Sequence, residues 1–285
     1  MKYGLPYQGS KSRIAEWVVD VLPASHTLVD LFAGGGAVTH CALLSGKWQR
    51  FIMSDITDSA RVFWDAAHGE YHGFSTVLTR EEFMECEDTA LKLLYSFGND
   101  KTTYLWSPEL ETVKVPAAKM ISAPSIHERR IAYREFVKRF YEYVIGGGDC
   151  DMRLQPVKRW QNMQNLEALE RLEALERLEA LERLDYRDVG IPKGSTVYAD
   201  PPYRSTPNSS RYGAQFDFAA FDEWLATVDS PVYVSEYDAP KGCVEIASKE
   251  RMTSMAANVT GKRVERIFVQ ERFADQYQPD RRRIF

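Results

Sequence analysis

The sequence predicts an α/β fold, with strands and helices alternating along the chain. Three apolar stretches carry this prediction. Residues 27–31 pass into a glycine-rich turn and then a helical pattern, residues 51–54 end in Asp55 before another helical pattern, and residues 196–199 stop abruptly at Asp-Pro-Pro. Open α/β sheets bind their ligands beyond the carboxyl ends of the strands, so these three ends are candidate parts of a site.

The composition is that of an ordinary globular protein, with 44% hydrophobic residues among 285. No apolar run approaches membrane-span length and no signal-peptide pattern is present. The net charge of −5 is uneven, because residues 101–160 carry 11 Lys/Arg against 7 Asp/Glu, and such a local basic surface is enough to contact phosphates. The four cysteines are far apart, which predicts reduced thiols in a cytoplasmic protein, without disulfides or a metal site: Cys41, Cys86, Cys150 and Cys243.

The N-terminal segment combines a tight turn with a helix start. Gly9 and Ser10 precede Lys11, and an amphipathic stretch follows over residues 14–22. A helix that begins near Ser12 directs its positive end and the Lys11 ammonium outward. The segment is either an N-capped surface helix or a site for a carboxylate, such as that of a methionine group.

The first strand leads into a loop with three consecutive glycines. Phe32, Gly34 and Gly36 have the spacing F-x-G-x-G, after Asp30 at the strand end, and a helix is expected from Ala37. Glycines allow positive φ and a close approach of the backbone to a ligand. The dinucleotide fingerprint G-x-G-x-x-G is not matched, so a nicotinamide site is not favoured.

The second strand ends at Asp55, an acid about 20 residues past the glycine loop. An acid there either accepts both hydroxyls of a ribose or caps the helix expected over residues 59–67. Together with the glycine loop, ribose binding is favoured, with Ile56 packing on an adenine ring.

The strand over residues 196–199 ends in a rigid tip, Asp200-Pro201-Pro202-Tyr203. Consecutive prolines have a fixed φ and no N–H, so they end the strand and keep the chain extended. The tip is either an ordinary strand exit or a pocket for a planar base with an exocyclic amino group. Asp200 and the Pro201 carbonyl suit the two amino hydrogens, and Tyr203 suits stacking on the ring.

The distance between Asp55 and the strand at 196–199 is too long for one loop, which predicts an insertion over residues 76–159. Within it, residues 81–97 predict a helix, and residues 104–106 predict a short exposed aromatic run. We expect the insertion to recognise the target of the protein.

Residues 127–144 form the clearest helical pattern of the insertion, with Ile131, Phe136, Phe140 and Val144 at helical spacing. The helix either packs on the core as an ordinary amphipathic helix or holds a DNA backbone, as basic residues mixed with tyrosines do. The candidate DNA contacts are Arg129, Arg130, Arg134, Lys138 and Arg139.

Residues 166–184 contain three copies of Leu-Glu-Ala-Leu-Glu-Arg. Every residue is a strong helix former, and Glu and Arg four positions apart pair favourably, which favours a helix. Leucine recurs at every third residue, however, so its stripe circles an α-helix. A strand-like solenoid turn is the alternative, and we assign the repeat no chemistry.

The C-terminal part predicts further strands and loops. Residues 204–213 predict a mobile polar loop, residues 218–228 a helix and residues 231–235 a strand. Residues 244–248 and 264–269 predict an antiparallel pair. The polar loop between them, 254–263, carries two candidate phosphate contacts, Lys262 and Arg263, and residues 280–285 predict a frayed tail.

Taken in order, these motifs resemble one family. The Lys11 turn, the F-x-G-x-G loop, the strand-end Asp55 and the Asp-Pro-Pro-Tyr tip are similar to those of Dam-type (D12 class) DNA adenine-N6 methyltransferases, many of them from bacteriophages or prophages. The family commonly has Gly-Gly-Lys where this chain has Gly-Ser-Lys. The resemblance implies a Rossmann-like, mainly parallel sheet of seven strands with a terminal antiparallel hairpin, formed by residues 1–75 and 160–285, and S-adenosylmethionine as the cofactor.

The resemblance also implies roles for single residues. Asp30 and the glycine loop would lie against the amino-acid end of the cofactor, Asp185 would accept from its adenine amino group, and Tyr186 would pack on its adenine ring. A flipped-out adenine would attack the sulfonium methyl directly, with no metal. The candidate cofactor residues are Tyr7, Gly9, Lys11, Asp30, Phe32, Gly34, Gly36, Asp55, Ile56, Asp185 and Tyr186, and the candidate catalytic residues are Asp200, Pro201, Pro202 and Tyr203.

The implied partner is double-stranded DNA, methylated at a short specific site in the cytoplasm of a bacterial or phage-infected cell. Methylation of cytosine N4 is an alternative, because that amino group meets the same pocket chemistry, and an adenine in RNA is another. An alternative of a different class is a catalytically silent DNA-binding or assembly protein, with the leucine repeat as its contact surface.

Overall fold

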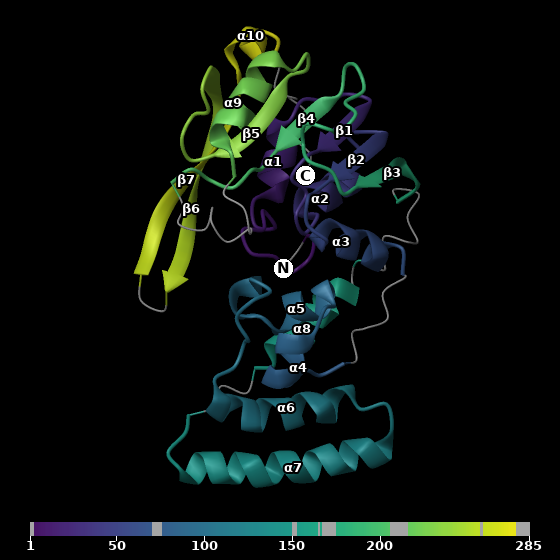
Figure 1. Cartoon of the computed structure of the whole chain (residues 1–285), viewed down its shortest axis with the longest axis vertical. Helices are drawn as coiled ribbons and strands as arrows, with labels where there is room; N and C mark the ends of the chain where they lie inside the picture. The colour runs from purple at the N-terminus through teal and green to yellow at the C-terminus, as the bar shows by residue number, and fades with distance from the viewer. Residues whose placement is uncertain are drawn as a thin grey trace.

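The structure is a computed structural model that describes residues 3–69, 76–149, 153–164, 166, 175–205, 216–256 and 259–277. These residues form a mixed α/β architecture, which confirms the fold class expected from the sequence. Figure 1 shows the strands gathered in one part of the molecule and a group of helices, α4 to α8, in another.

The centre of the sheet is parallel. β1 (Thr27–Asp30) pairs with β2 (Arg50–Ser54) on one side and with β4 (Thr196–Ala199) on the other, and β4 pairs with β5 (Val232–Glu236). Every residue of β1, β4 and β5 is buried, as expected of strands that are covered on both faces. The carboxyl ends of these parallel strands therefore meet at one edge of the sheet.

The antiparallel pair expected near the C-terminus is present, but its strands are longer than predicted. β6 (Cys243–Ala256) pairs with β7 (Val259–Gln270), and β7 also pairs with β5. The prediction of a polar loop over residues 254–263 is therefore wrong for most of that range. Backbone pairing continues through the polar residues because a two-stranded ribbon beyond the sheet needs no apolar face.

The leucine repeat contains a strand where a helix was favoured. β3 (Leu178–Glu182) follows a 3-10 turn at Leu175–Arg177 and pairs in parallel with β2. The helix prediction is wrong for these residues, because the free edge of β2 supplies backbone partners and Leu178 becomes buried there. The strand order is β3-β2-β1-β4-β5-β7-β6. Residues 167–174 of the repeat lie outside the described residues.

Successive side chains along the strands point to opposite faces of the sheet, so the core has two layers. On β4, Tyr198 belongs to one buried cluster, whereas Val197 and Ala199 belong to the other. The first layer contains α1 (Ala15–Val21), α2 (Ala37–Ser45) and α3 (Ser59–Ala67), and the second contains α9 (Phe218–Thr227).

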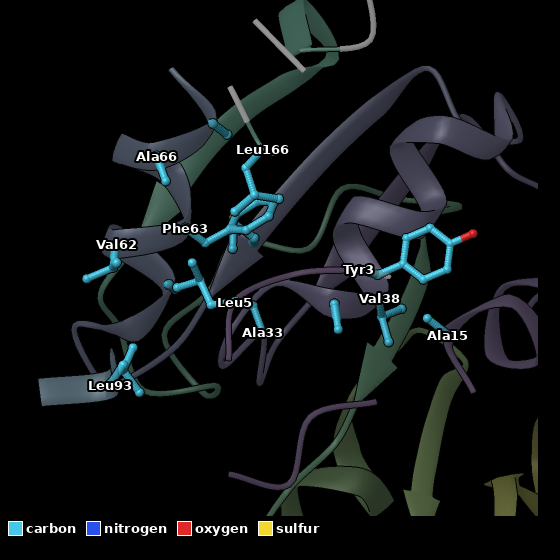
Figure 2. Packing of buried hydrophobic residues seen from close by; sticks show 14 of the residues in the cluster. Tyr3, Leu5, Ala15, Ala33, Val38, Val62, Phe63, Ala66, Leu93 and Leu166 are labelled. Carbon is cyan, nitrogen blue, oxygen red and sulfur yellow. The ribbon is translucent and has the colours of Figure 1, made fainter. Parts of the chain in front are cut away.

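The N-terminal segment is part of the first layer. Tyr3 and Leu5 are buried in the same cluster as Val38 of α2 and Phe63 of α3, as Figure 2 shows. The Leu5 N–H also donates to the carbonyl of Gly35 at 2.7 Å. These contacts fix the start of the chain against the glycine loop.

The insertion folds as helices that stand apart from the sheet (Figure 1). The single helix predicted over residues 81–97 is two helices, because Cys86 is extended and Asp88 caps the second helix by accepting from the Leu91 N–H. The helices are α4 (Arg80–Glu85), α5 (Thr89–Tyr95), α6 (Pro108–Ser122), α7 (Ile126–Ile145) and α8 (Gln155–Gln164).

The aromatic run expected to be exposed is buried. Tyr104 and Trp106 are 6% and 3% exposed, and their rings meet edge to face with centroids 5.9 Å apart. The Tyr104 hydroxyl donates to the Leu78 carbonyl at 2.8 Å. The prediction is wrong because these rings pack between helices that the local sequence does not reveal.

Among the helices that the structure describes, none is long and apolar enough to cross a membrane. In the same part of the chain, no three His, Cys, Asp or Glu residues are grouped so that they could hold a metal ion. The last described element is the short helix α10 (Glu271–Ala274).

Candidate functional site

The tip at the end of β4 carries Asp200, which Lys11 reaches from the N-terminal segment. Lys11 Nζ lies 2.7 Å from Asp200 Oδ1, and the two side chains are 7% and 17% exposed. The prediction that the Lys11 ammonium points outward is therefore wrong. The chain turns at this point, with the Ile14 N–H donating to the Lys11 carbonyl, and the buried carboxylate attracts the ammonium inward.

Burial and nearby charges act on the Asp200 carboxyl in opposite directions. Burial raises the pKa of Asp200, the charge of Lys11 lowers it and the charge of Glu265 raises it, with a net increase. A carboxylate has roughly four lone-pair directions, so the ion pair with Lys11 leaves acceptor capacity on Asp200.

Tyr203 is held from three sides. Its hydroxyl donates to Glu265 Oε1, its ring meets Tyr237 edge to face with centroids 4.5 Å apart, and Lys11 Nζ lies 4.7 Å from its ring centroid. Burial raises the pKa of Tyr203 well above its ordinary value, so the hydroxyl remains protonated and can donate. The ring at the tip is therefore fixed in position.

Glu265 was not among the predicted site residues. It lies in β7, is 0% exposed and has its Oε1 3.5 Å from Lys11 Nζ. The only signal in the sequence is an acid inside a strand-forming run, since a buried acid requires a partner. That signal names neither the partner nor its position.

The residues after the tip are anchored to neighbouring elements. The Arg204 N–H donates to Glu236 Oε2 at 3.0 Å, and the Arg204 guanidinium pairs with Asp222 of α9 at 2.5 Å. Burial raises the pKa of Glu236 to about 7, although hydrogen bonds from the backbone lower it. Residues 206–213 of the predicted mobile loop lie outside the described residues.

The glycine loop after β1 packs tightly against Tyr7 and Phe63. Gly34 and Gly36 have φ angles of 52° and 69°, and an added Cβ would lie 2.8 Å from the Tyr7 ring and 2.5 Å from the Phe63 ring. Glycine alone combines these φ angles with such close contacts. Gly9 also has a positive φ of 82°, but its position is open.

Asp30, at the end of β1, is buried and has an unused acceptor. Its Oδ2 accepts from the Thr39 hydroxyl at 2.8 Å, whereas Oδ1 has no hydrogen-bond partner among the described residues. Burial raises the pKa of Asp30 to about 7, against the hydrogen bond from Thr39. A buried acceptor without a donor is costly, so this oxygen marks a place where a bound donor would fit.

Asp55 connects the end of β2 to the glycine loop. Its Oδ2 accepts from the Gly34 N–H at 2.8 Å, and its Oδ1 accepts from the N–H and hydroxyl of Thr57 at 2.8 and 2.7 Å. It does not cap α3, whose N-cap residue is Asp58. The neighbouring Ile56 is 64% exposed and offers an apolar surface beside this acid.

The glycine loop and the tip lie side by side. β1 and β4 are neighbouring parallel strands, and the Leu31 N–H donates to the Tyr198 carbonyl at 3.0 Å. The N-terminal segment touches both parts, because Tyr7 lies on the glycine loop and Lys11 pairs with Asp200. The structure thus brings these predicted residues together at one edge of the sheet.

The predicted adenine contacts Asp185 and Tyr186 have partners within the protein. Asp185 forms a bidentate ion pair with Arg187, at 2.7 and 2.9 Å, and the hydrogen bond lowers the pKa of Asp185. Tyr186 is 6% exposed, with its ring centroid 5.4 Å from that of Phe32 and 5.2 Å from that of Phe221. Phe32 and Tyr186 therefore belong to one aromatic cluster beside the glycine loop.

The predicted DNA-contact helix forms as α7, but none of its residues is buried. Of its four apolar residues at helical spacing, Ile131 and Val144 are 54% and 48% exposed, whereas Phe136 and Phe140 are half-buried. α7 lies against α6, at the end of the molecule farthest from the sheet (Figure 1). An exposed helix with this composition has its outer face available to a partner.

The basic residues of α7 fall into two groups. Arg139 pairs with Glu135 at 2.7 Å and with Glu142 at 3.6 Å, so its charge is largely balanced within the helix. Another three basic residues recur at intervals of four and form an exposed basic row. This row consists of Arg130, Arg134 and Lys138.

The remaining DNA candidates lie at the ends of other elements. Arg129 is exposed in the first turn of α7, and its Nη2 donates to the Ala123 carbonyl at 3.4 Å. Arg263 lies in β7 with its guanidinium 5.1 Å from the Tyr237 ring centroid, which places it near the tip. Lys262 is in register with Met252 in the β6–β7 ribbon.

Comparisons with known proteins agree with the motifs. Residues 7–144 match the family model described as D12 class N6 adenine-specific DNA methyltransferase. The match covers the lysine turn, the glycine loop, the strand-end acid and most of the insertion, and it indicates an adenine-specific DNA methyltransferase. No curated protein matched the chain.

Proposed function

We propose that this chain, an adenine-specific DNA methyltransferase of the D12 class, methylates the exocyclic N6 of an adenine rotated out of the duplex at a short specific site. Methyltransferases of this family generally use S-adenosylmethionine and act on DNA. The observation that carries the finer proposal is the junction at Tyr7 and Lys11, where one short segment touches both the glycine loop and the Asp200 tip.

The groups around the glycine loop fit S-adenosylmethionine. Asp30 Oδ1, which has no hydrogen-bond partner among the described residues, suits an ammonium donor, and Asp55 suits ribose hydroxyls. When bound, the cofactor supplies a methyl group activated by its sulfonium charge. Lys11, which we expected at the methionine carboxylate, forms an ion pair with Asp200 instead.

The tip acts on the amino group of the target base. Asp200 and the Pro201 carbonyl accept the two N6 hydrogens, which reduces delocalisation of the nitrogen lone pair into the ring and aims it at the methyl group. As the new C–N bond forms and the C–S bond breaks, the nitrogen becomes positive and its proton becomes acidic. Lys11 favours the ionised form of Asp200, which can then accept that proton.

The base must leave the helix because its amino group is out of reach within the stack. Tyr203 offers the stacking surface for the extruded base, with Pro202 keeping the backbone rigid before it. Tyr237 and Glu265 hold the ring of Tyr203 in place, so its orientation exists before the base arrives.

The insertion, residues 76–159, supplies the DNA-binding surface in this proposal. Its exposed basic row on α7 suits phosphates, which give DNA binding its affinity and salt dependence. Arg263 on the β6–β7 ribbon suits a phosphate near the target base, because β7 also contributes Glu265 to the site.

The test is transfer of labelled methyl groups from S-adenosylmethionine to unmethylated, PCR-amplified DNA of mixed sequence, followed by identification of the modified nucleoside. N6-methyladenine in the digest supports the proposal, N4-methylcytosine supports the alternative base, and the absence of any transfer contradicts both. Parallel reactions with RNA test the other substrate.

Asp200→Asn tests the tip, because it keeps the shape of the side chain and removes its charge. We expect methyl transfer to fall by about 100-fold or more, the scale of a lost acid–base group. Asp238→Asn, an exposed acid beyond β5, is the matched control and is expected to retain activity. Full activity of Asp200→Asn would remove the tip from the mechanism.

A further inference from the structure

We propose that Glu265 is a positioning residue of the methyl-transfer site, which holds Tyr203 and Lys11 in place beside Asp200. The inference rests on the proposed function and adds to it a residue outside the motifs that identified the family. Residues 7–144, which match the family model, do not include Glu265.

Glu265 is a fully buried acid in the middle of a strand. It is 0% exposed and lies in β7, in register with Lys249 of β6 and next to Arg266, which is in register with Glu236 of β5. A carboxylate in such a place is costly unless charged or hydrogen-bonding groups compensate for the lost water. Its partners include groups of the candidate site.

One oxygen of Glu265 contacts two groups of the site. Oε1 accepts the hydrogen bond from the Tyr203 hydroxyl and lies 3.5 Å from Lys11 Nζ. The hydrogen bond holds the far end of the Tyr203 ring, while Tyr237 contacts it edge to face. Together these contacts remove the freedom of the ring to turn away from a stacked base.

Glu265 also sets the charge of the site. Two carboxylates, Asp200 and Glu265, share the single ammonium of Lys11, at 2.7 and 3.5 Å. With both acids ionised, the group carries an excess negative charge in a place from which water is largely excluded. This charge favours the positive nitrogen that forms as the methyl group is transferred, because fixed charges act strongly where little water screens them.

The charge of Glu265 has a measurable effect on Asp200. It raises the pKa of Asp200, which Lys11 lowers, so removing it shifts the ionisation of Asp200 to lower pH. Other elements packed around Asp200 contribute charged or titratable groups that stay unchanged in such a variant. They are Asp30 on β1, Tyr198 on β4, Tyr203 on the tip and Glu236 on β5.

Glu265→Gln separates positioning from charge, because the amide oxygen still accepts from the Tyr203 hydroxyl. With PCR-amplified DNA of mixed sequence, we expect kcat to fall about 10- to 100-fold, below the 10²–10³-fold loss of a group in direct contact with the reacting atoms. We expect KM for S-adenosylmethionine to stay within about 3-fold, because the contacts of Glu265 described above are with Tyr203 and Lys11. The acid limb of the kcat–pH profile moves to lower pH.

Glu265→Asp keeps the charge and withdraws the oxygen from Tyr203 and Lys11. We expect a similar fall in kcat without the shift of the acid limb toward lower pH. The matched control is Glu245→Gln on β6, whose side chain is 42% exposed and pairs with Arg266, and which is expected to behave as the wild type.

Circular dichroism first confirms that each variant is folded. A wild-type kcat in Glu265→Gln, with an unmoved acid limb, overturns the inference, and so does a wild-type kcat in Glu265→Asp if the Gln variant does not fold. An inactive wild-type protein contradicts the proposed function itself, so the two failures are distinguishable.

Discussion

Lys11 Nζ lies 2.7 Å from Asp200 Oδ1, although the two residues are 189 positions apart in the chain. The same ammonium lies 3.5 Å from Glu265 on β7. A single residue of the N-terminal segment therefore joins the end of β4 to the antiparallel part of the sheet. This ion cluster is both a structural joint and the electrostatic centre of the site.

Lys11→Met removes the ammonium and leaves two carboxylates buried without it. We expect a loss of about 3–5 kcal/mol in the free energy of unfolding, the usual cost of removing one partner from a buried ion pair. We also expect methyl transfer to be abolished, since the site loses the charge that favours ionised Asp200. Urea denaturation measures the first effect. Lys241→Met, at an exposed position, should change stability by less than about 0.5 kcal/mol.

Asp30 makes stability depend on pH. Burial raises the pKa of Asp30 from 3.8 to about 7. The contribution of the protonated Asp30 carboxyl to the free energy of unfolding is therefore fully present below about pH 3.8 and is lost as the pH rises through about 7. We expect the unfolding free energy of the wild type to fall relative to that of Asp30→Asn across this window. The slope is at most about 1.4 kcal/mol per pH unit. Equal pH dependence of the two proteins would contradict this assignment.

The raised pKa of Asp30 also predicts how the affinity for the cofactor varies with pH. An ammonium donor at Asp30 Oδ1 binds the ionised acid best, so we expect affinity for S-adenosylmethionine to rise several-fold between about pH 6 and pH 8. Calorimetric titration at both pH values measures it. The Asp30→Asn variant should bind more weakly and with little of this pH dependence.

Gly46, which lies outside the glycine loop, is a matched control for Gly36 of that loop, because the two residues have nearly the same φ angle but different surroundings. Their φ angles are 69° and 68°, but a Cβ on Gly36 would lie 2.5 Å from Phe63, whereas a Cβ on Gly46 would meet nothing within 4 Å. We expect Gly46→Ala to cost about 1 kcal/mol for the φ angle alone. Gly36→Ala should cost about 1–3 kcal/mol more, because the ring must move. Thermal or urea denaturation of both variants gives the difference.

The two groups of basic residues on α7 predict different effects on DNA binding. Removing Arg130 or Lys138 from the exposed row should weaken binding to mixed-sequence DNA and reduce the log–log salt slope by about 1 for each phosphate that is no longer neutralised. Arg139→Ala should leave the slope unchanged, since Arg139 pairs with Glu135 and Glu142. Fluorescence anisotropy at several salt concentrations distinguishes them. Equal slopes in all variants would place the DNA surface elsewhere.

The sequence predicts those parts of the fold whose signal is local. The strands at β1, β2, β4 and β5 and the helices α1, α3 and α7 appear near their expected positions, because apolar runs and helical spacing reflect burial directly. β3 could not be predicted in this way. Its residues favour a helix, and only the open edge of β2 makes a strand preferable.

The residues of the candidate site differ in the same way: some lie in local motifs, and others depend on contacts between distant segments. Asp200, Tyr203 and the glycine loop follow from short motifs, and the structure brings them together at one edge of the sheet. The inward position of the Lys11 side chain and the contact of Glu265 with the site depend on contacts between distant segments. No local pattern contains such contacts, so the sequence alone left them out.

The ion cluster draws on residue 11 and residue 265, so it can form only after β7 has left the ribosome. A nascent chain that ends before β7 has Lys11 and Asp200 but lacks the second carboxylate, that of Glu265, to which the Tyr203 hydroxyl donates. Closing so long a loop is also slow compared with forming the local helices. The surroundings of Asp200 are therefore completed late in synthesis, by the strand that follows β6.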